Sequence, residues 1–284
     1  MEAIARPAPK IRLAGVSKEY VVPRSGQRTL AIADISLDIE RGEFVCIVGP
    51  SGCGKSTILN MIAGLAEPTA GNVAMDGTMI RAPGPERGVV FQDYALFPWK
   101  TVRENVEFGP RFRADARLTT AERDKLVRHY IDLVSLNGAE NKYPHELSGG
   151  MRQRCALARA LANEPDVLLM DEPFAALDAQ TRLILQEELL RIWGEDLPRV
   201  ERRTVVFITH GIDEAVFLAD RVAVMSNQPG RIKTVMTIGL PRPRRESLRA
   251  TPEFQRLAED IWQLIRREAY EATIDHQSVK GGVT

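Results

Sequence analysis

Gly49-Pro50-Ser51-Gly52-Cys53-Gly54-Lys55-Ser56-Thr57 is the stretch that decides how this chain folds. It matches the pattern G-x-x-x-x-G-K-[ST], follows an apolar run at residues 44–48 and precedes a helical pattern at residues 57–64. Glycines let such a loop curl so that several backbone N–H groups meet phosphate oxygens, and the next helix directs its positive end at the anion. We expect every residue of this loop to contact a nucleotide, with Lys55 at the β- and γ-phosphates and the Ser56 hydroxyl on Mg²⁺.

A second apolar run ends in two acids, because Val167-Leu168-Leu169-Met170 is followed by Asp171-Glu172-Pro173. In open α/β sheets, ligands bind at the carboxyl ends of the strands. Asp171 is therefore expected to hold Mg²⁺ through its water shell, and Glu172 to polarise or deprotonate an attacking water. The same pattern, taken alone, fits ordinary solvated acids at a strand end, so its catalytic interpretation depends on the phosphate loop upstream.

Short apolar runs alternate with helical patterns along the chain after the phosphate loop. Such alternation predicts a parallel sheet with helices on both faces. The strand-like runs are at residues 88–91, 204–209, 221–225 and 233–238, and the helical patterns at residues 148–162, 179–193 and 212–218.

The remaining segments predict two attachments to this core. Residues 11–20, 30–39 and 72–80 read as strands, the last with a hairpin turn at Asp76-Gly77. Helical patterns at residues 102–108 and 121–134 lie in a stretch punctuated by Gly and Pro. The predicted fold class is α/β: a P-loop NTPase (RecA-like) core with an antiparallel β subdomain and an inserted α-helical subdomain.

We predict two domains. An ATPase domain would span residues 1–240, with the helical subdomain inserted at about residues 93–160, and a C-terminal helical extension would span residues 241–284. Apolar residues recur at helical spacing over residues 252–268. A helix packed on the core is favoured there over a regulatory or dimer contact, and residues 277–284 are expected to be disordered.

Composition excludes several classes of function. Lys+Arg and Asp+Glu both number 38, so no bulk attraction to nucleic acid is expected. Cys46, Cys53 and Cys155 lack the spacing of a zinc site and suit a reducing cytosol. Residues 1–10 lack the apolar core of a signal peptide, and no apolar run approaches the roughly 20 residues that span a bilayer. Any membrane part would have to come from another chain.

Leu147-Ser148-Gly149-Gly150-Met151-Arg152-Gln153-Arg154 resembles the signature sequence of the ABC-type ATPases. The resemblance covers about residues 11–240, because the phosphate loop, Gln92, the signature, Asp171-Glu172, Ala176-Leu177-Asp178 and His210 follow in the family's order. It implies that two copies dimerise head to tail. Each ATP would then lie between the phosphate loop of one copy and Ser148, Gly149 and Gly150 of the other. A helix start suits this role, because it offers N–H groups, a hydroxyl and the helix dipole to an anion.

Other roles follow by matching position. Tyr20 resembles the aromatic residue that stacks on adenine, with a core-packed aromatic as the alternative. Gln92 resembles the residue that touches Mg²⁺ and the attacking water, and His210 the switch histidine at the γ-phosphate. Asp178 would bridge the two copies. The resemblance thus implies Glu172, His210, Lys55 and Gln92 as the catalytic set, and Ser56, Gln92 and Asp171 as the Mg²⁺ set.

Two positions depart from the family pattern. Met151 stands where Gln is frequent, which uptake-type members tolerate. Gly211 follows the switch histidine where related chains often have Asp. Since Gly caps a helix less well than Asp, we expect a looser helix start there without loss of ATPase activity.

The segment Leu96-Phe97-Pro98-Trp99-Lys100-Thr101-Val102, with Leu240-Pro241-Arg242-Pro243-Arg244, resembles the nitrate/sulfonate/taurine branch of bacterial importers. Phe97 and Trp99 fit either a socket for a helix of a membrane subunit or the core of the helical subdomain. The resemblance implies a permease dimer and a substrate-binding protein on other chains, and a peripheral location on the cytoplasmic face of the inner membrane. The transported solute cannot be read from this chain, which would not touch it.

Two other functions agree less well with the sequence. A soluble ABC-type ATPase acting on nucleic acid or the ribosome usually carries paired ATPase units, a long coiled coil or zinc modules. The stretch between Gln92 and Leu147 is too short for a long coiled coil. A non-catalytic regulatory subunit disagrees with the intact Lys55, Asp171, Glu172 and His210.

Overall fold

A six-stranded sheet forms the centre of the computed structural model, which describes residues 8–21, 26–112 and 118–280, the last stretch without side chains beyond residue 266. The strand order is β10-β9-β3-β8-β7-β6, and all neighbours are parallel except β10 and β9. The strands are β3 (Phe44–Val48), β6 (Arg87–Val90), β7 (Val167–Asp171), β8 (Thr204–Ile208), β9 (Arg221–Met225) and β10 (Ile232–Thr237).

The two faces of this sheet belong to two separate hydrophobic clusters. Along β3, Phe44, Cys46 and Val48 lie in one cluster, and Val45 and Ile47 lie in the other. The first is completed by residues of α4 (Gly149–Leu161), α5 (Ala179–Trp193) and α6 (Ile212–Leu218), and the second by residues of α1 (Lys55–Ala63). A strand buried on both faces reads as a continuous apolar run, which is why these strands were predictable.

A smaller antiparallel sheet covers the α1 side in the order β2-β1-β4-β5. Its strands are β1 (Ile11–Val21), β2 (Arg28–Ile39), β4 (Ala70–Met75) and β5 (Thr78–Met79). Asp76 and Gly77 make the predicted turn with φ values of 48° and 77°. Buried Lys10 donates to Asp76 Oδ2 at 2.6 Å and to Asp166 Oδ2 at 2.7 Å, which ties this sheet to the residue before β7. The predicted fold class is confirmed.

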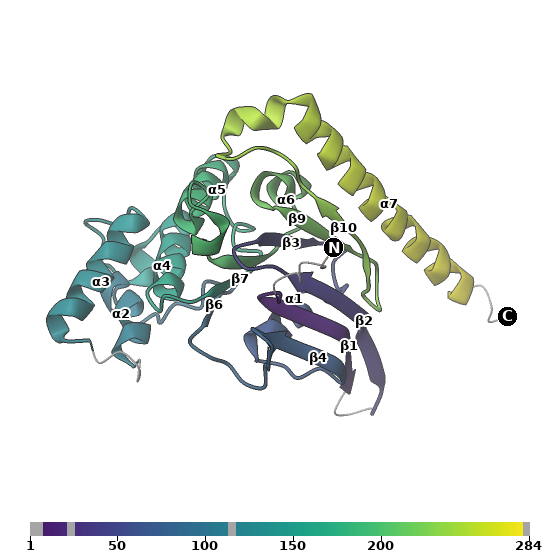
Figure 1. Ribbon diagram of the computed structural model, residues 1–284, viewed down its shortest axis with the longest axis horizontal. Coiled ribbons are helices and arrows are strands. Elements are labelled where there is room, and N and C mark those ends of the chain that lie inside the picture. Colours follow the sequence, from purple (N-terminus) through teal and green to yellow (C-terminus); the bar gives the residue numbers. More distant parts are fainter. Residues whose placement is uncertain (1–7, 22–25, 113–117, 281–284) are drawn as a thin grey trace, which may run out of the picture.

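Between β6 and β7 the chain forms α2 (Val102–Arg111), α3 (Thr120–Leu133), the 3-10 turn η1 (Pro144–Glu146) and α4. Capping boxes start both α2 and α3, because Thr101 and Thr119 each accept from the backbone N–H three residues on. The three helices pack on one another and form the helical region at the left of Figure 1.

The chain after β10 forms the 3-10 turn η3 (Glu246–Ala250) and the long helix α7 (Pro252–Lys280); a further turn, η2 (Arg199–Glu201), lies before β8. Phe254 and Ile261 are buried in the main core, so the first half of α7 packs on the body as predicted. The helix runs beyond residue 268 and projects away from the body (Figure 1). It includes residues 277–280, which were expected to be disordered; residues 281–284 lie outside the described part.

Arg244 anchors this extension. The side chain is 1% exposed, and its Nη1 donates to the carbonyls of Val216, Phe217 and Ala219 at 3.1, 2.9 and 2.8 Å. These carbonyls belong to the C-terminal end of α6, where a helix leaves its last acceptors unpaired. The Arg244 N–H donates to Glu195 Oε2 at 3.0 Å. The Pro241-Arg242-Pro243 segment therefore leads into a buried attachment point.

Of the helices in the described ranges, none is both long and apolar enough to span a bilayer.

Candidate functional site

The candidate site lies where three neighbouring parallel strands end. Ile47 of β3 pairs with Ile208 of β8, and Ile208 pairs with Asp171 of β7. The strands therefore end at the same edge, so that the phosphate loop, the two acids and His210 emerge side by side. Topology alone brings together three segments that are far apart in the sequence.

The phosphate loop turns sharply into α1 at Gly54, which has a φ of 95°. A Cβ there would lie 2.3 Å from Ile32 Cγ2, so both the backbone conformation and the space require glycine. Lys55 is the first residue of α1 and is buried. Its Nζ donates to the carbonyls of Gly49 and Pro50 at 3.0 and 2.9 Å, which places the ammonium inside the curl of the loop.

Asp171 is suited to a cation. Its Oδ1 is buried and has no hydrogen-bond partner among the described residues. Burial raises the pKa of Asp171 and the charge of Glu172 adds to this, while the Ser56 hydroxyl, Lys55 and His210 act in the opposite direction. An unpaired buried carboxylate oxygen beside a hydroxyl supplies the oxygen ligands that Mg²⁺ prefers.

The protein would contribute few ligands to such an ion. In the parts of the chain that the structure describes, no group of three or more His, Cys, Asp or Glu side chains is placed to hold a metal. Mg²⁺ commonly keeps several waters and takes one or two carboxylates together with substrate phosphates. Asp171 and Ser56 fit that pattern.

Glu172 and His210 meet directly. His210 Nε2 lies 2.6 Å from Glu172 Oε1, and Glu172 has a φ of 45°, a conformation that non-glycine residues rarely adopt. The Glu172 N–H donates to Ile208 O at 3.0 Å, which holds this turn against β8. Residues kept in such conformations cluster at active sites.

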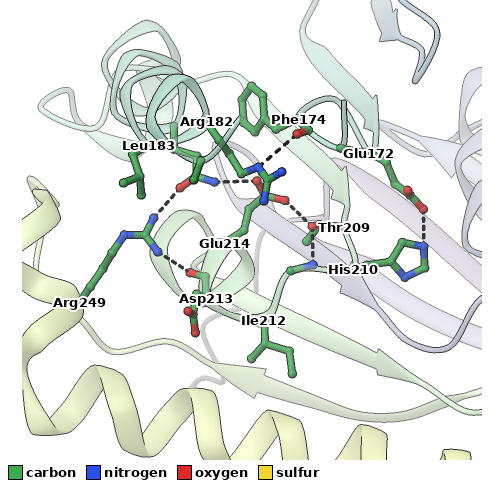
Figure 2. A pocket seen from close by; sticks show the side chains of 14 residues that line it. Glu172, Phe174, Arg182, Leu183, Thr209, His210, Ile212, Asp213, Glu214 and Arg249 are labelled. Atoms are coloured by element: carbon green, nitrogen blue, oxygen red, sulfur yellow. Dashed lines mark hydrogen bonds and ion pairs between the residues drawn. The ribbon is translucent and has the colours of Figure 1, made fainter. Parts of the chain in front are cut away.

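The start of α6 is organised by Thr209. Gly211 is the N-cap and supplies no side-chain hydrogen bond. Instead the Gly211 N–H donates to Thr209 Oγ1 at 2.8 Å, and Thr209 Oγ1 also bonds to Glu214 in the first turn. The expected loosening at Gly211 is therefore offset by a hydroxyl two residues earlier. These residues border a cavity of about 650 Å³ that reaches α5 and η3 (Figure 2).

Gln92 and Tyr20 are both exposed. Gln92 is exposed in the turn after β6, at the same sheet edge, and makes no side-chain hydrogen bond to the described residues. Tyr20 is exposed near the end of β1, with Lys18 Nζ 5.4 Å from the centroid of its ring. The ring is not part of the core, contrary to the alternative that the sequence left open.

Ser148, Gly149 and Gly150 form the predicted helix start. Ser148 is the N-cap of α4 and accepts from the Met151 N–H at 3.3 Å. A Cβ on Gly150 would lie 2.8 Å from Thr181 Cγ2, so glycine allows α4 to approach α5. Asp178 caps α5 by accepting from the Thr181 N–H at 2.9 Å. Figure 1 places α4 in the helical region, away from α1, so one chain does not bring this helix start to its own phosphate loop.

An aromatic groove lies between β6 and α2. Its volume is about 580 Å³, and its lining includes Phe91, Phe97, Phe108 and Arg159. Phe97 is partly buried and packs against Phe108 with the rings tilted and their centroids 4.4 Å apart. Trp99, 5.8 Å from Phe97 by centroid, is 71% exposed and so does not belong to the subdomain core.

Several polar residues beside the site were not predicted from the sequence. Gln186 and Glu214 are buried and hydrogen-bonded to each other, and Arg249 reaches them from η3. Gln186 and Glu214 stand beside other polar residues in their helical patterns, Arg249 lies outside any predicted element, and no motif marks the three.

Comparisons with known proteins agree with this geometry. A family model described as ABC transporter matches residues 32–175. The nitrate import ATP-binding protein NrtD of Synechococcus elongatus is 48% identical over 259 residues, covering 90% of this chain and 92% of that protein. An ABC transporter ATP-binding protein of Methanocaldococcus jannaschii is 46% identical over 263 residues, covering 93% and 94%.

Solved structures agree as well. A dimeric ATP-binding cassette in a post-hydrolysis state, bound to ADP and Pi, superposes with a TM-score of 0.70 at 34% identity, covering 80% of this chain and 98% of that one. The protein cbiO1 of Clostridium perfringens, part of the ABC transporter complex cbiONQ, superposes with a TM-score of 0.68 at 27% identity, covering 82% and 90%.

Proposed function

This chain belongs to the ABC transporter family of ATP-binding proteins, and from that premise we propose that two copies of it, paired head to tail, drive the uptake of a small solute through a separate permease. The chain is an ATPase of this family. One observation carries the proposal: Lys55, Asp171, Glu172 and His210 converge at one sheet edge, while Ser148 starts a helix elsewhere in the fold.

Residues 49–57 would hold the phosphates of ATP, and Tyr20 would stack on its adenine. The Lys55 ammonium lies inside the curl of the loop, which supports a contact with the β- and γ-phosphates. Ser56 and Asp171 would bind Mg²⁺, with Gln92 joining them from the turn after β6. When bound, Mg²⁺ supplies charge compensation at the phosphate oxygens.

Glu172 would act on the attacking water as a general base or by polarising it. Its position at the strand end, next to Asp171 and within hydrogen-bond distance of His210, supports this role. His210 would contact the γ-phosphate and so report its presence to Glu172. Both residues come from strand ends beside the phosphate loop, so neither depends on a distant loop for its position.

The second half of each ATP site would come from the other copy. Ser148, Gly149 and Gly150 present N–H groups and the positive end of α4 to an anion. A dimer is also the form in which the similar cassette with ADP and Pi was solved. Asp178, at the start of α5, would lie at the contact between the copies.

We assign the membrane partner to the aromatic groove. A short helix of a permease would place apolar side chains among Phe91, Phe97 and Phe108, with exposed Trp99 beside Phe97. The NrtD relatives are nitrate import proteins, which supports nitrate, a sulfonate, taurine or a related small solute as cargo. A substrate-binding protein would deliver it, and this chain would lie peripherally at the cytoplasmic face of the inner membrane.

We also propose a division of the chain into two domains. Residues 1–240 would form the ATPase domain, with the helical subdomain at about residues 93–160, and residues 241–284 the C-terminal extension. Arg244 joins the two by its contacts with α6.

Co-purification of the full-length chain from its native membrane tests the proposal. The expected result is a complex with a permease and, in the presence of a binding protein, ATP hydrolysis stimulated by one solute. Reconstitution in vesicles should then give ATP-dependent uptake of that solute. Recovery of nucleic acid or ribosomes in place of a membrane protein would contradict the proposal.

A further inference from the structure

We propose that Arg249 of the C-terminal extension is a positioning residue for ATP hydrolysis, acting through Gln186 and Glu214 on Thr209, the residue before His210. This inference depends on the role proposed above for His210. It adds a function for the extension, which packs outside the nucleotide site.

The four side chains form an unbroken chain of hydrogen bonds. Arg249 Nη2 donates to Gln186 Oε1, Gln186 Nε2 donates to Glu214 Oε1 at 2.7 Å, and Thr209 Oγ1 bonds to Glu214 Oε2. Figure 2 shows these bonds running from Arg249 to Thr209 beside the cavity. They connect η3, α5, α6 and the end of β8. Gln186, Glu214 and Thr209 are all buried.

The direction of each bond is set by chemistry. A guanidinium only donates and an ionised carboxylate only accepts. Gln186 can join Arg249 to Glu214 because its amide has both an acceptor and a donor. Thr209 Oγ1 accepts from the Gly211 N–H at 2.8 Å, which leaves its own proton for Glu214 Oε2. Both oxygens of Glu214 are therefore used, one towards the extension and one towards the site.

Thr209 fixes the backbone on both sides of His210, because it precedes His210 and its hydroxyl binds the residue that follows it. Its hydroxyl binds Glu214 and also the N–H of Gly211, the residue after His210. The imidazole itself is 44% exposed, so packing does little to fix it. Apart from its contact with Glu172 at 2.6 Å, its position depends on Thr209 and Gly211, which flank it and are joined through the Thr209 hydroxyl.

Arg249 is itself firmly placed. Its guanidinium lies 4.2 Å from the ring centroid of Phe217, and its Nη1 donates to Asp213 O at 3.4 Å. Burial raises the pKa of Glu214, while bonds from Thr209 and Gln186 and the charges of Arg182 and Arg249 oppose this. Loss of Arg249 would therefore raise the pKa of Glu214 further and leave the Gln186 amide oxygen without its donor.

An exchange of the two central residues tests this arrangement. In the Gln186→Glu variant two carboxylates face each other, so the central bond is lost. In the double variant Gln186→Glu/Glu214→Gln, the carboxylate introduced at position 186 accepts from Arg249 and from the amide introduced at position 214. The oxygen of that amide in turn accepts from Thr209. The exchange keeps composition and charge and restores every donor–acceptor pair.

Two further variants complete the set. Arg249→Gln removes the outer end of the chain of hydrogen bonds. Arg256→Gln removes a charge from an exposed site on α7 and is the matched control.

Full-length variants are compared for kcat, KM for ATP, ATP affinity and thermal unfolding. We expect Gln186→Glu and Arg249→Gln to lower kcat roughly tenfold to a hundredfold, as misplacement of a catalytic group does, with ATP affinity unchanged because the phosphate loop is untouched. The double variant should recover most of kcat, and Arg256→Gln should retain it.

The proposal is overturned if Gln186→Glu turns over normally, or if the double variant stays as slow as the single one while binding ATP and unfolding at the same temperature as the unaltered chain. A His210→Ala variant separates this inference from the function on which it rests. Normal turnover by His210→Ala would remove the role of His210, and with it this inference. Slow turnover by His210→Ala beside unaffected Arg249→Gln would remove only the link to the extension.

Discussion

His210 Nε2 lies 2.6 Å from Glu172 Oε1, so the residue that would sense the γ-phosphate contacts the residue that would act on water. The two come from the ends of β8 and β7, which are neighbours in the sheet. Glu172 reaches this position through a φ of 45°, and its N–H is bonded to Ile208 O at the end of β8. The backbone of Glu172 and its contact with His210 therefore place the carboxylate at the end of β7.

Replacement of this carboxylate should separate ATP binding from ATP hydrolysis. Glu172→Gln keeps the size of the side chain and an oxygen that can accept from His210, but it removes the basic group. We expect turnover to fall at least about a hundredfold, the usual contribution of a general base. ATP should still bind, and a dimer that persists in ATP should be seen by size-exclusion chromatography.

The matched control is Glu253→Gln, an exposed glutamate in the first turn of α7. It should turn over like the unaltered chain. Near-normal turnover by Glu172→Gln would show that another residue is the base.

Replacement of Trp99 tests the proposed contact with the permease without changing a residue of the ATP site. Because the side chain is 71% exposed, Trp99→Ala should change the free energy of unfolding by less than about 0.5 kcal/mol and leave the ATPase activity of the isolated chain intact. If it is an anchor for the permease, its loss should weaken the complex by about 2 kcal/mol, or roughly thirtyfold. Pull-down of the permease measures this.

Trp262→Ala, at a half-exposed tryptophan on α7, is the control for loss of an indole ring. Equal recovery of the permease with both variants would exclude the groove beside Trp99 as the docking site.

Arg244 should be essential for stability because its side chain donates hydrogen bonds to the carbonyl groups at the C-terminal end of α6. Arg244→Met retains the apolar stem but leaves the buried carbonyls of Val216, Phe217 and Ala219 without this donor. We expect a loss of about 3 kcal/mol in the free energy of unfolding, measured in urea. Arg231→Met, at an exposed arginine, should cost little. Equal unfolding midpoints for the two variants would contradict this account.

Most of the sheet was predictable because its strands are buried on both faces. The runs Phe44–Val48 and Val167–Asp171 stand out from their surroundings, and the motifs that follow them fix which ends carry the site. Ser148 was recognisable as a helix start from residue type and position, since a serine before two glycines satisfies the first N–H groups. In each of these cases the signal is local.

The hydrogen bonds that join Arg249, Gln186 and Glu214 could not be predicted, because they depend on contacts between elements and not on a local pattern. Gln186, Glu214 and Arg249 come from three separate elements, and their pairing depends on how α5, α6 and η3 pack. Arg244 illustrates the same limit, because a buried arginine is recognised only once the carbonyls around it are known. Nor does the sequence of α7 show where the helix ends, since no Gly or Pro stands between residues 269 and 280.

The division of the ATP site between two chains leads to a prediction about mixtures. Ser148 and Lys55 lie in different parts of one chain, at the starts of α4 and α1 (Figure 1). In a symmetric head-to-tail dimer, each site would use Lys55 of one copy and Ser148 of the other. Lys55→Ala and Ser148→Arg therefore damage opposite halves of each site, and each variant alone should be nearly inactive.

Mixing the two inactive variants should restore activity, because a dimer with one copy of each has both defects in one site and none in the other. With random pairing of equal amounts, half of the dimers are mixed and each has one intact site, so turnover should reach about a quarter of that of the unaltered chain. The measurement is ATP hydrolysis as a function of the mixing ratio, which should be greatest at equal amounts. Lys125→Ala, at an exposed lysine on α3, replaces Lys55→Ala in the control mixture; there, activity should simply follow the fraction of copies with intact residues. A mixture of Lys55→Ala and Ser148→Arg that stays inactive at every ratio would mean that the site is not shared in this way.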